Sequence, residues 1–247
     1  VVLGTPADET SGAKVEMAEK GAFNDLDIAL IVHPLAKFMK SGSSLAMDAI
    51  EFTFKGKTAH AAAAPEKGIN ALDACIATFN AINALREHMI SSSRIHGIIK
   101  EGGKAANIVP DLAVAQFYVR TVSKTYLKEL SEKVKDCARA GALTAGAELE
   151  IRNFEASYDN LVTNNNLQEL FVKNLNLVGV DNIEEAEDSS GSTDVGNVSQ
   201  VCPSIHPYFA ICEEGVDIPT HTVKFAQATI TEVAIQNMEE QLLVKIK

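Results

Sequence analysis

Three groups of polar residues stand at the ends of expected structural elements, where they could act together on a metal ion. Asp8 and Glu9 follow a short apolar strand and a proline turn. His33 follows the apolar run 28–32, and His221 precedes the last expected helix. Carboxylate oxygens and imidazole nitrogens suit Zn²⁺ or Mn²⁺ better than Ca²⁺ or Cu(I). Glu9, His33 and His221 therefore form a candidate ligand set, with Asp8 as a candidate general base.

Each of these residues also has a structural interpretation. An adjacent acidic pair such as Asp8-Glu9 is most often a solvated turn, and a lone histidine is more often packed or hydrogen-bonded than functional. For His33 the position favours a site, because ligands bind beyond the carboxyl ends of strands in open α/β sheets. The residues alone leave both interpretations open.

The elements that must position these residues fall into two outer segments. The run 28–32 is apolar without alternation, which predicts a strand buried on both faces. The other outer elements are expected as a strand end at 1–3, helices at 13–20 and 167–177, a strand at 208–211 and a helix at 223–244.

Between the outer segments the pattern changes to that of a separate domain. Residues 46–57 alternate between apolar and polar, which predicts a strand with one face in water. The expected elements that follow are a helix at 70–89, strands at 95–99 and 112–121, a helix at 127–143 and a strand at 149–154. This βαββαβ order is ferredoxin-like. The expected fold is α/β: a discontinuous domain with a mixed sheet at 1–44 and 158–247, and an inserted ferredoxin-like domain at 45–157.

Composition excludes some classes of function. The net charge is −11, from 22 basic and 33 acidic side chains, and there is no basic cluster. This argues against nucleic acid or an anionic membrane as a partner. The four cysteines form no CxxC pair, so we expect reduced thiols and a cytoplasmic protein. Because the sequence opens on Val1-Val2-Leu3, we also expect a further N-terminal segment outside it.

A series of short motifs runs in order along nearly the whole chain. They are GTPADE at 4–9, HP at 33–34, GKTAHA at 56–61, GINA at 68–71, HGII at 96–99, ANIVP at 106–110, GSTDVGNV at 191–198, HPY at 206–208 and His221. The ordered set resembles the metallopeptidases and amidohydrolases of the aminoacylase/carboxypeptidase type, peptidase family M20. The nearest branches are acyl-amino-acid amidohydrolases and the β-alanyl-lysine dipeptidase-like group.

The resemblance implies a reaction and a role for each matching residue. The reaction is hydrolysis of an amide or peptide bond in a small carboxylate-bearing substrate, such as an acyl-amino acid, an aminobenzoyl-glutamate-like compound or a dipeptide. It would use zinc or manganese, two ions per complete site, in a homodimer formed through the inserted domain, the lid. The implied roles are Asp8 as general base, Glu9, His33 and His221 as metal ligands, His60 as oxyanion donor in the partner's site, Asn107 and Arg120 as carboxylate holders, and Gly191, Ser192 and Thr193 as a substrate-contacting loop.

Two departures from the family pattern matter. The family has Glu where this chain has Asp8, and a base misplaced by about 1 Å can slow a reaction around a hundredfold. The family's remaining metal ligands come from a motif upstream of the GTPADE stretch, and this sequence holds nothing upstream.

Three hypotheses follow from these residues. The first is an enzyme whose N-terminal segment is not in view. The second is a shortened, metal-free homologue that acts as a binding or oligomerisation module. The third, a serine or cysteine hydrolase, has little support because no GxSxG elbow is present. Among single residues, Arg120 is equally compatible with a salt bridge, His206 is expected to be structural, and His88 and His96 are expected to be surface or strand residues.

Overall fold

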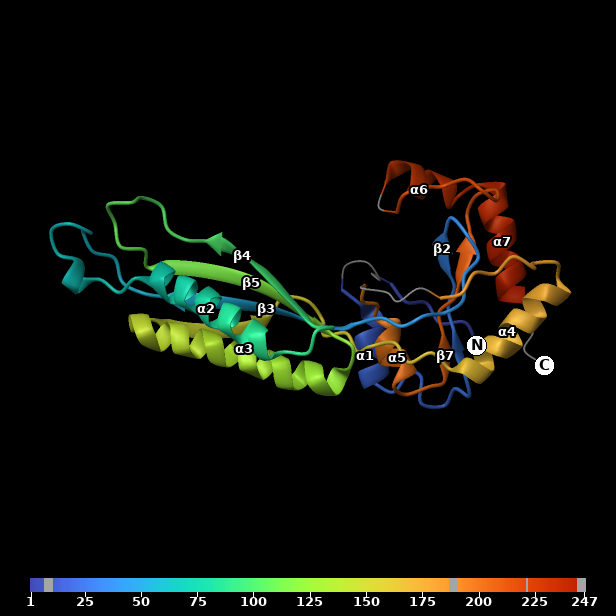
Figure 1. Cartoon of the computed structure of the whole chain (residues 1–247), viewed down its shortest axis with the longest axis horizontal. Coiled ribbons are helices and arrows are strands. Elements are labelled where there is room, and N and C mark those ends of the chain that lie inside the picture. Colours follow the sequence, from blue (N-terminus) through green and yellow to red (C-terminus); the bar gives the residue numbers. More distant parts are fainter. Residues whose placement is uncertain (7–10, 187–190, 221, 244–247) are drawn as a thin grey trace. The chain divides into compact units, whose positions relative to one another are not determined.

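The computed structural model describes residues 1–6, 11–186, 191–220 and 222–243. The chain divides into an outer unit, Val1–Ser44 with Leu161–Lys247, and an inserted unit, Leu45–Asn160 (Figure 1). The inserted unit thus ends at residue 160, where the sequence pattern suggested 157. None of the described helices is both long enough and apolar enough to cross a bilayer.

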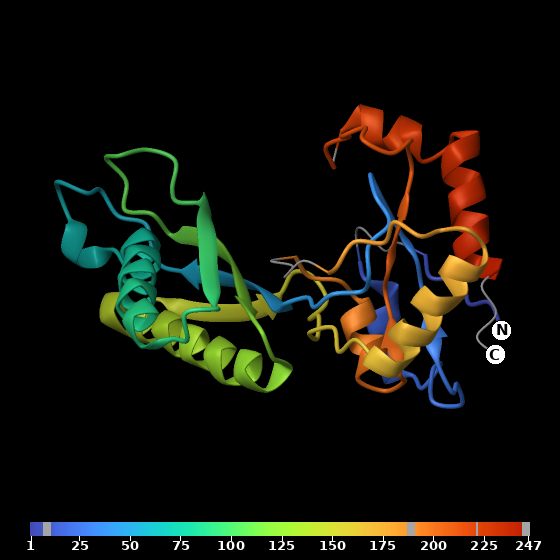
Figure 2. The same cartoon turned by 45° about the vertical axis from the view of Figure 1, so that its right-hand side comes forward.

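The inserted unit is one antiparallel sheet covered on one face by two helices. Its elements are β3 (Ala46–Lys55), α2 (Ala71–Leu85), β4 (Arg94–Glu101), β5 (Leu112–Thr121), α3 (Lys124–Ala145) and β6 (Glu148–Asn153), with short 3₁₀ turns at Pro65–Lys67 and Arg86–His88. The strand order is β4-β5-β3-β6, and α2 and α3 lie side by side against the sheet in both views (Figures 1 and 2). This confirms the ferredoxin-like prediction.

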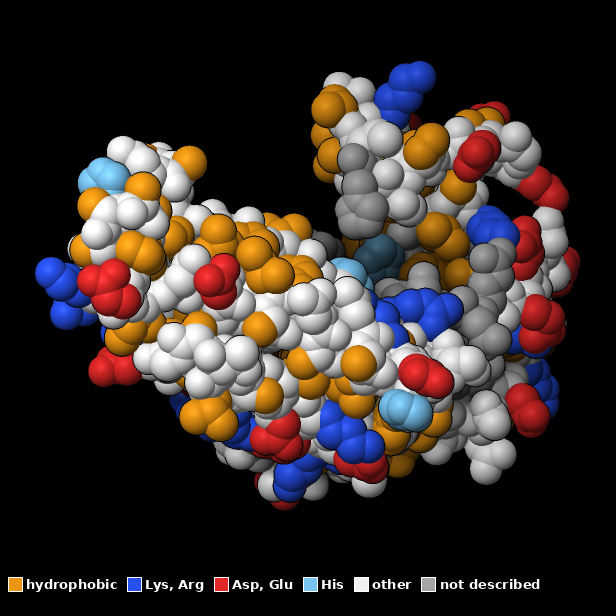
Figure 3. All heavy atoms as spheres, turned by 60° about the vertical axis from the view of Figure 1, so that its left-hand side comes forward, with side chains coloured by type: hydrophobic (Ala, Val, Ile, Leu, Met, Phe, Trp, Pro, Cys, Tyr) orange, Lys and Arg blue, Asp and Glu red, His pale blue; other side chains and the backbone are white. Residues whose placement is uncertain are grey.

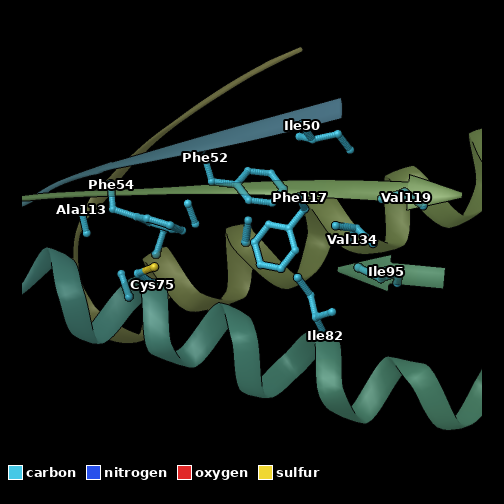
Figure 4. Packing of buried hydrophobic residues seen from close by; sticks show 14 of the residues in the cluster. Ile50, Phe52, Phe54, Cys75, Ile82, Ile95, Ala113, Phe117, Val119 and Val134 are labelled. Carbon is cyan, nitrogen blue, oxygen red and sulfur yellow. The ribbon is translucent and has the colours of Figure 1, made fainter. Parts of the chain in front are cut away.

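Aromatic side chains from neighbouring strands fill the core of the inserted unit. Phe52, Phe54 and Phe117 are fully buried between the sheet and the helices (Figure 4). The Phe117 ring lies 4.7 Å from that of Phe79 on α2. Cys75 is a free, buried thiol in the same cluster, as expected for a reduced cysteine. Packing of this kind makes the sheet a rigid support for residues on its other face.

Helix α2 differs from the expected helix at 70–89. It begins after Asn70, whose side chain accepts hydrogen bonds from the backbone N–H of Leu72 and Asp73, and it ends at Leu85. Its buried face carries small residues, Ala71, Ala74, Cys75 and Thr78, with Ile82. The larger Ile76 is 44% exposed. Small residues face the core because α3 approaches α2 closely there.

Glu51 on β3 also departs from expectation, since its face of the sheet was expected to be wet. It is only 5% exposed, because β3 lies in the middle of the sheet and side chains of both neighbouring strands cover it. Gln116 donates to one carboxylate oxygen at 2.7 Å, and Arg152 donates to the other at 2.7 Å. The buried charge is therefore paired, as burial requires.

In the outer unit two chain stretches run parallel with one interruption. β1 (Ala29–Leu30) pairs with β7 (Ser204–Ile205), and β2 (His33–Leu35) pairs with β8 (Tyr208–Ala210) in the same register. Pro207 lies at the interruption and has no N–H to donate to the ladder. The strand expected at 28–32 ends earlier than predicted, at Leu30, and His33 begins a second strand.

Helices surround these strands in the outer unit. They are α1 (Ala13–Glu19), α4 (Asn165–Leu177), α5 (Val195–Ser199), α6 (Val223–Ala228) and α7 (Glu232–Leu243). The single helix expected at 223–244 is two helices. The break lies at Thr231, whose side-chain oxygen accepts a hydrogen bond from Ala234 N at 3.3 Å. A threonine in this position caps a new helix instead of continuing the old one.

Candidate active site

Two aromatic rings, those of His206 and Tyr208, pack around His33 in the outer unit. His33 lies directly opposite Tyr208 in the β2–β8 ladder, and their ring centres are 5.5 Å apart. His206 precedes Tyr208 by two residues, so both side chains lie on the same face of the chain. The His206 ring is 5.6 Å from His33 and stacks on Tyr208 at 5.7 Å. The interrupted ladder thus brings a predicted ligand together with two residues 173 and 175 positions away.

The hydrogen bonding of His33 suits a metal ligand. Its Nδ1 lies 2.8 Å from the carbonyl oxygen of Pro34. A carbonyl can only accept, so Nδ1 carries the proton and Nε2 keeps its lone pair. Metal-binding histidines commonly donate their second ring N–H to a carbonyl in this way. His206 is 6% exposed beside it, and burial raises the pKa of the Tyr208 hydroxyl.

The remaining predicted metal-site residues cannot be placed. Asp8, Glu9 and His221 lie outside the described residues. Within the described part of the chain, no group of three or more His, Cys, Asp or Glu side chains could hold a metal ion. His33 fits the chemistry of one ligand, and the roles of Asp8, Glu9 and His221 stay predictions.

A buried ion pair links the start of α1 to the 191–193 loop. Lys14 Nζ lies 3.0 Å from Asp194 Oδ1, and the backbone N–H of Lys14 donates to Asp194 Oδ2 at 3.1 Å. The two side chains are 4% and 1% exposed. Asp194 directly follows Thr193, the last residue of the predicted substrate loop, and Lys14 follows Glu9 by five residues. Asp194 belongs to the GSTDVGNV motif, but no motif contained Lys14 or indicated that the two residues would pair.

At the tip of the inserted unit the structure joins His60 and Asn107. The backbone of His60 bridges to Ile108, and Ala61 N donates to the carbonyl of Asn107 at 3.0 Å. The Nδ1 atom of the exposed His60 ring accepts from the backbone N–H groups of Ala62 and Ala63, at 3.3 and 3.1 Å. The ring proton therefore resides on Nε2, which is free to act as a donor.

Arg120 does not lie near this tip. It occupies the other end of β5, where it pairs in register with Met47, two residues after the unit begins. Arg120 is eight steps along the strand from Leu112 at the tip end, a distance of roughly 26 Å at about 3.3 Å per step. Asn107 and Arg120 of one chain therefore lie too far apart to hold the same carboxylate, and their roles as carboxylate holders stay predictions.

Two groups of residues beside candidate site residues were not identified from the sequence. His206 was expected to be structural, and the structure confirms that it is buried and packed, but its neighbour is the candidate ligand His33. Its spacing of two from Tyr208, on a strand that pairs with His33, is the signal that could have found it. Arg120, His96 and Glu155 all contact Tyr118; strand register places His96 and Arg120 there, whereas Glu155 follows the end of β6.

Comparison with known proteins supports the architecture. A family model described as a peptidase dimerisation domain matches residues 47–145. A Bacillus subtilis structure, described as a dinuclear metal-binding peptidase from the M20 family, superimposes with a TM-score of 0.63 at 18% identity. That alignment covers 98% of this chain and 64% of the other, and it supports the fold.

Two curated relatives share more sequence. The Xaa-Arg dipeptidase of Mus musculus is 38% identical over 237 residues, which is 95% of this chain and 54% of that protein. A p-aminobenzoyl-glutamate hydrolase subunit of Escherichia coli is 32% identical over 178 residues, 71% of this chain and 37% of that protein. The chain thus spans about half the length of the dipeptidase it matches. Together with the ordered motifs and the fold, these relationships identify the chain as a homologue of M20 peptidases.

Proposed function

We propose that the protein hydrolyses an amide or peptide bond in a small substrate with a free carboxylate, using a divalent metal ion held in part by His33. The observation that carries the proposal is the hydrogen bond of the His33 ring. Its Nδ1–H donates to the Pro34 carbonyl oxygen, which leaves the lone pair of Nε2 available to bind a metal. A bound zinc or manganese ion would polarise the scissile carbonyl and lower the pKa of water. The B. subtilis neighbour, described as dinuclear, supports two ions per site.

The proposed ligand set and base follow from the family motifs. Glu9 and His221 would join His33 as ligands, and Asp8 would take the proton of the attacking water. The Gly191–Thr193 loop would contact the substrate, and the Lys14–Asp194 ion pair supports the end of that loop. His206 and Tyr208 pack against His33 and would hold its ring in place.

His60 would stabilise the oxyanion that forms as water attacks. Its Nε2–H is available because Nδ1 already accepts from two backbone N–H groups. A hydrogen-bond donor fixed before the reaction costs no reorganisation when the charge develops. By the family resemblance this histidine would act in the site of the other subunit, so that His60 of the partner subunit would serve each active centre.

The proposed substrate is a dipeptide with a basic C-terminal residue. The two relatives reported above are named for substrates of opposite charge, arginine in one and glutamate in the other. The dipeptidase is the more similar and covers almost the whole chain, which favours the basic residue. Arg120 would hold the substrate's C-terminal carboxylate through its two-pronged guanidinium.

A homodimer formed through the inserted unit is part of the proposal. The match to a peptidase dimerisation domain supports it. The unit has two edge strands, and β6 carries charges at Glu148, Glu150 and Arg152, which discourage strand pairing. On the other edge, Ile98 and Ile99 of β4 are 60% and 43% exposed. Figure 3 shows hydrophobic side chains, in orange, gathered over the surface of the inserted unit.

The test is hydrolysis of alanyl-arginine and p-aminobenzoyl-glutamate by the complete natural protein, with zinc or manganese present. We expect release of arginine. His33→Ala should lower kcat/KM about a hundredfold or more, since even indirect supports of metal ligands contribute 10- to 100-fold. The matched control is His88→Ala, an exposed histidine in the inserted unit, which should change nothing. If neither substrate is cleaved under any metal condition, the metal-free binding module becomes the better account.

A further inference from the structure

The tip of the inserted unit contains a short antiparallel ladder in which His60 lies directly opposite Ile108. On one side of this pair Val109 N donates to the carbonyl oxygen of Ala59 at 2.9 Å, and on the other the hydrogen bond from Ala61 N described above joins the two stretches. His60 and Ile108 are therefore a pair without hydrogen bonds to each other, the kind in which opposite Cα atoms are about 4.5 Å apart and the side chains are closest.

The two faces of this ladder have different surroundings. Val109 is 9% exposed, and a Cβ added to Gly68 would lie 3.0 Å both from its Cγ1 and from Ala59 Cβ. Ala59 and Val109 thus pack against the backbone at Gly68, which supports the ladder on its inner face. Because side chains alternate along a strand, His60 and Ile108 project from the other face. Both are exposed, Ile108 at 46%.

The packing of the inserted unit does not use the Ile108 side chain. It belongs to none of the hydrophobic core clusters that the described residues form. A single exposed isoleucine is ordinary on a protein surface and needs no special explanation. The position of Ile108 is what distinguishes it, because its neighbour on the same face is the proposed oxyanion donor.

We infer that Ile108 contacts the side chain of the substrate's N-terminal residue and gives the enzyme a preference for an apolar residue there. The inference rests on the proposed function, in which Nε2–H of His60 donates to the oxygen of the scissile carbonyl. Cross-strand side chains directly opposite each other have Cβ atoms roughly 4.5–5.5 Å apart. Ile108 would therefore lie beside the groups that flank this carbonyl, in the same active centre as His60.

The chemistry of the substrate indicates which flanking group meets Ile108. The proposed C-terminal residue carries a carboxylate and a side-chain cation, and a charged group loses water beside an apolar side chain without gaining a partner. The side chain of the N-terminal residue can be apolar, and it then gains free energy by removing its own surface and that of Ile108 from water. The favoured substrate is thus an apolar residue followed by a basic one.

The experiment compares leucyl-arginine, glycyl-arginine and glutaminyl-arginine, with the complete natural protein and zinc or manganese present. Leucine and glutamine have side chains of similar size, so this pair separates apolarity from bulk. The wild type should cleave leucyl-arginine with a kcat/KM about tenfold or more above the other two. Ile108→Ala should lower the leucyl-to-glycyl ratio of kcat/KM about tenfold, since even one methylene in an apolar pocket can discriminate by ten- to two-hundredfold.

Two control variants separate the contact from general effects of mutation. Ile108→Leu conserves the apolar volume and should keep the leucyl-to-glycyl ratio within about threefold of the wild type. Ile90→Ala removes an isoleucine of similar exposure, 42%, just before β4 and at the end of the sheet away from the tip. It should leave the ratio unchanged. A ratio of two substrates does not depend on how much of a variant is folded, so loss of folded protein cannot imitate the expected result.

Mixed dimers test whether Ile108 acts together with His60 in the site of the other subunit. In a dimer of one Ile108→Ala subunit and one His33→Ala subunit, the site with all its metal ligands belongs to the first. It receives the tip of the second, which still carries Ile108. We expect the wild-type leucyl-to-glycyl ratio. A ratio as low as that of the Ile108→Ala homodimer would overturn the placement of Ile108 in the partner's site.

The outcomes distinguish this inference from the proposed function. If none of the three dipeptides is cleaved, the proposed function fails and the inference fails with it. If they are cleaved but the wild type does not prefer leucyl-arginine, the reaction stands and the inference alone is wrong. The same conclusion follows if Ile108→Ala keeps the wild-type ratio.

Discussion

At the scale of single residues, the Lys14–Asp194 contact is the most demanding feature of the outer unit. Both side chains are almost fully buried, and the lysine is bound through its ammonium and its backbone N–H to the two oxygens of one carboxylate. Removing one partner of such a pair leaves the other charge buried and uncompensated. The cost of leaving one charge buried without its partner is therefore larger than the net stabilisation that the intact pair provides.

We predict that Lys14→Met destabilises the outer unit by about 3–5 kcal/mol, the usual cost of breaking a buried ion pair. The control is Lys20→Met on the same helix, where the partner Glu16 is exposed, and it should change stability by less than about 1 kcal/mol. Urea unfolding of both variants measures the difference. Equal midpoints for the two variants would contradict this view of the pair.

Cys75 gives the inserted unit a dependence on alkaline pH. Burial raises the pKa of its thiol from 9.0 to about 11. The unfolded chain loses this proton at a lower pH than the folded chain does. The contribution of the protonated thiol to the free energy of unfolding is therefore fully present below pH 9 and is lost as the pH rises from 9 toward 11. We expect the urea midpoint of the wild type to fall more steeply over this range than that of Cys75→Ala. Parallel slopes would show that the thiol does not contribute.

The motifs could be recognised from the sequence, but the sequence could not show which distant side chains contact each other. His33 was identified as a ligand candidate from its motif. Its neighbours His206 and Tyr208 depend on the parallel register of two short strands about 175 residues apart. Glu155 carried no motif, and only the fold places it beside Tyr118. Contacts between residues so far apart in the sequence depend on the tertiary fold, and neither composition nor periodicity predicts them.

At the scale of elements, the close approach of α2 and α3 shapes the inserted unit. A Cβ added to Gly141 on α3 would lie 2.3 Å from Thr78 Oγ1 and 2.6 Å from the backbone oxygen of Ala74. This proximity accounts for the small residues on the buried face of α2. The larger Ile76 of α2 lies outside this interface and is 44% exposed.

We predict that Gly141→Ala destabilises the inserted unit by about 1–3 kcal/mol or more, because the methyl group meets backbone as well as side chain. Ala140→Ser, at the neighbouring exposed position of α3, should stay within about 0.5 kcal/mol of the wild type. Chemical denaturation of both variants provides the comparison. A Gly141→Ala protein as stable as the control would show that the helices can separate at no cost.

Expected and observed elements agree best where the periodicity is long. β5 matches its expected range of 112–121, and α3 encloses the expected 127–143. The expectations failed where a local signal overrides periodicity. Pro207 interrupts the strand ladder at His33, and Thr231 caps a new helix inside the stretch expected to be continuous. Each of these breaks comes from a single residue that ends or begins an element, and a periodic pattern over many residues does not reveal it.

At the scale of the whole molecule, the edge strands determine how two copies could associate. The exposed isoleucines of β4 and the charged residues of β6 make the two edges of the inserted sheet unlike each other. A strand edge with exposed apolar side chains is suited to pairing with a second chain, whereas a charged edge resists it.

We therefore predict that Ile98→Glu converts a dimer into a monomer, because it places a charge in the apolar edge. Glu150→Lys, on the opposite edge, should leave the dimer intact. Sedimentation equilibrium at micromolar protein gives the mass of each variant. If Ile98→Glu is still a dimer, the interface does not lie at β4. If the wild type is a monomer, the proposed dimer is wrong.

The central claim is that a metal ion bound at His33 carries the hydrolysis. The most direct measurement is the hydrolysis of alanyl-arginine by the complete natural protein after chelation, followed by zinc or manganese titration, with bound metal counted by mass spectrometry. We predict that activity disappears on chelation and returns in proportion to metal, with two ions bound per chain in the wild type and fewer in His33→Ala. Full activity in the chelated, metal-free protein would contradict the claim.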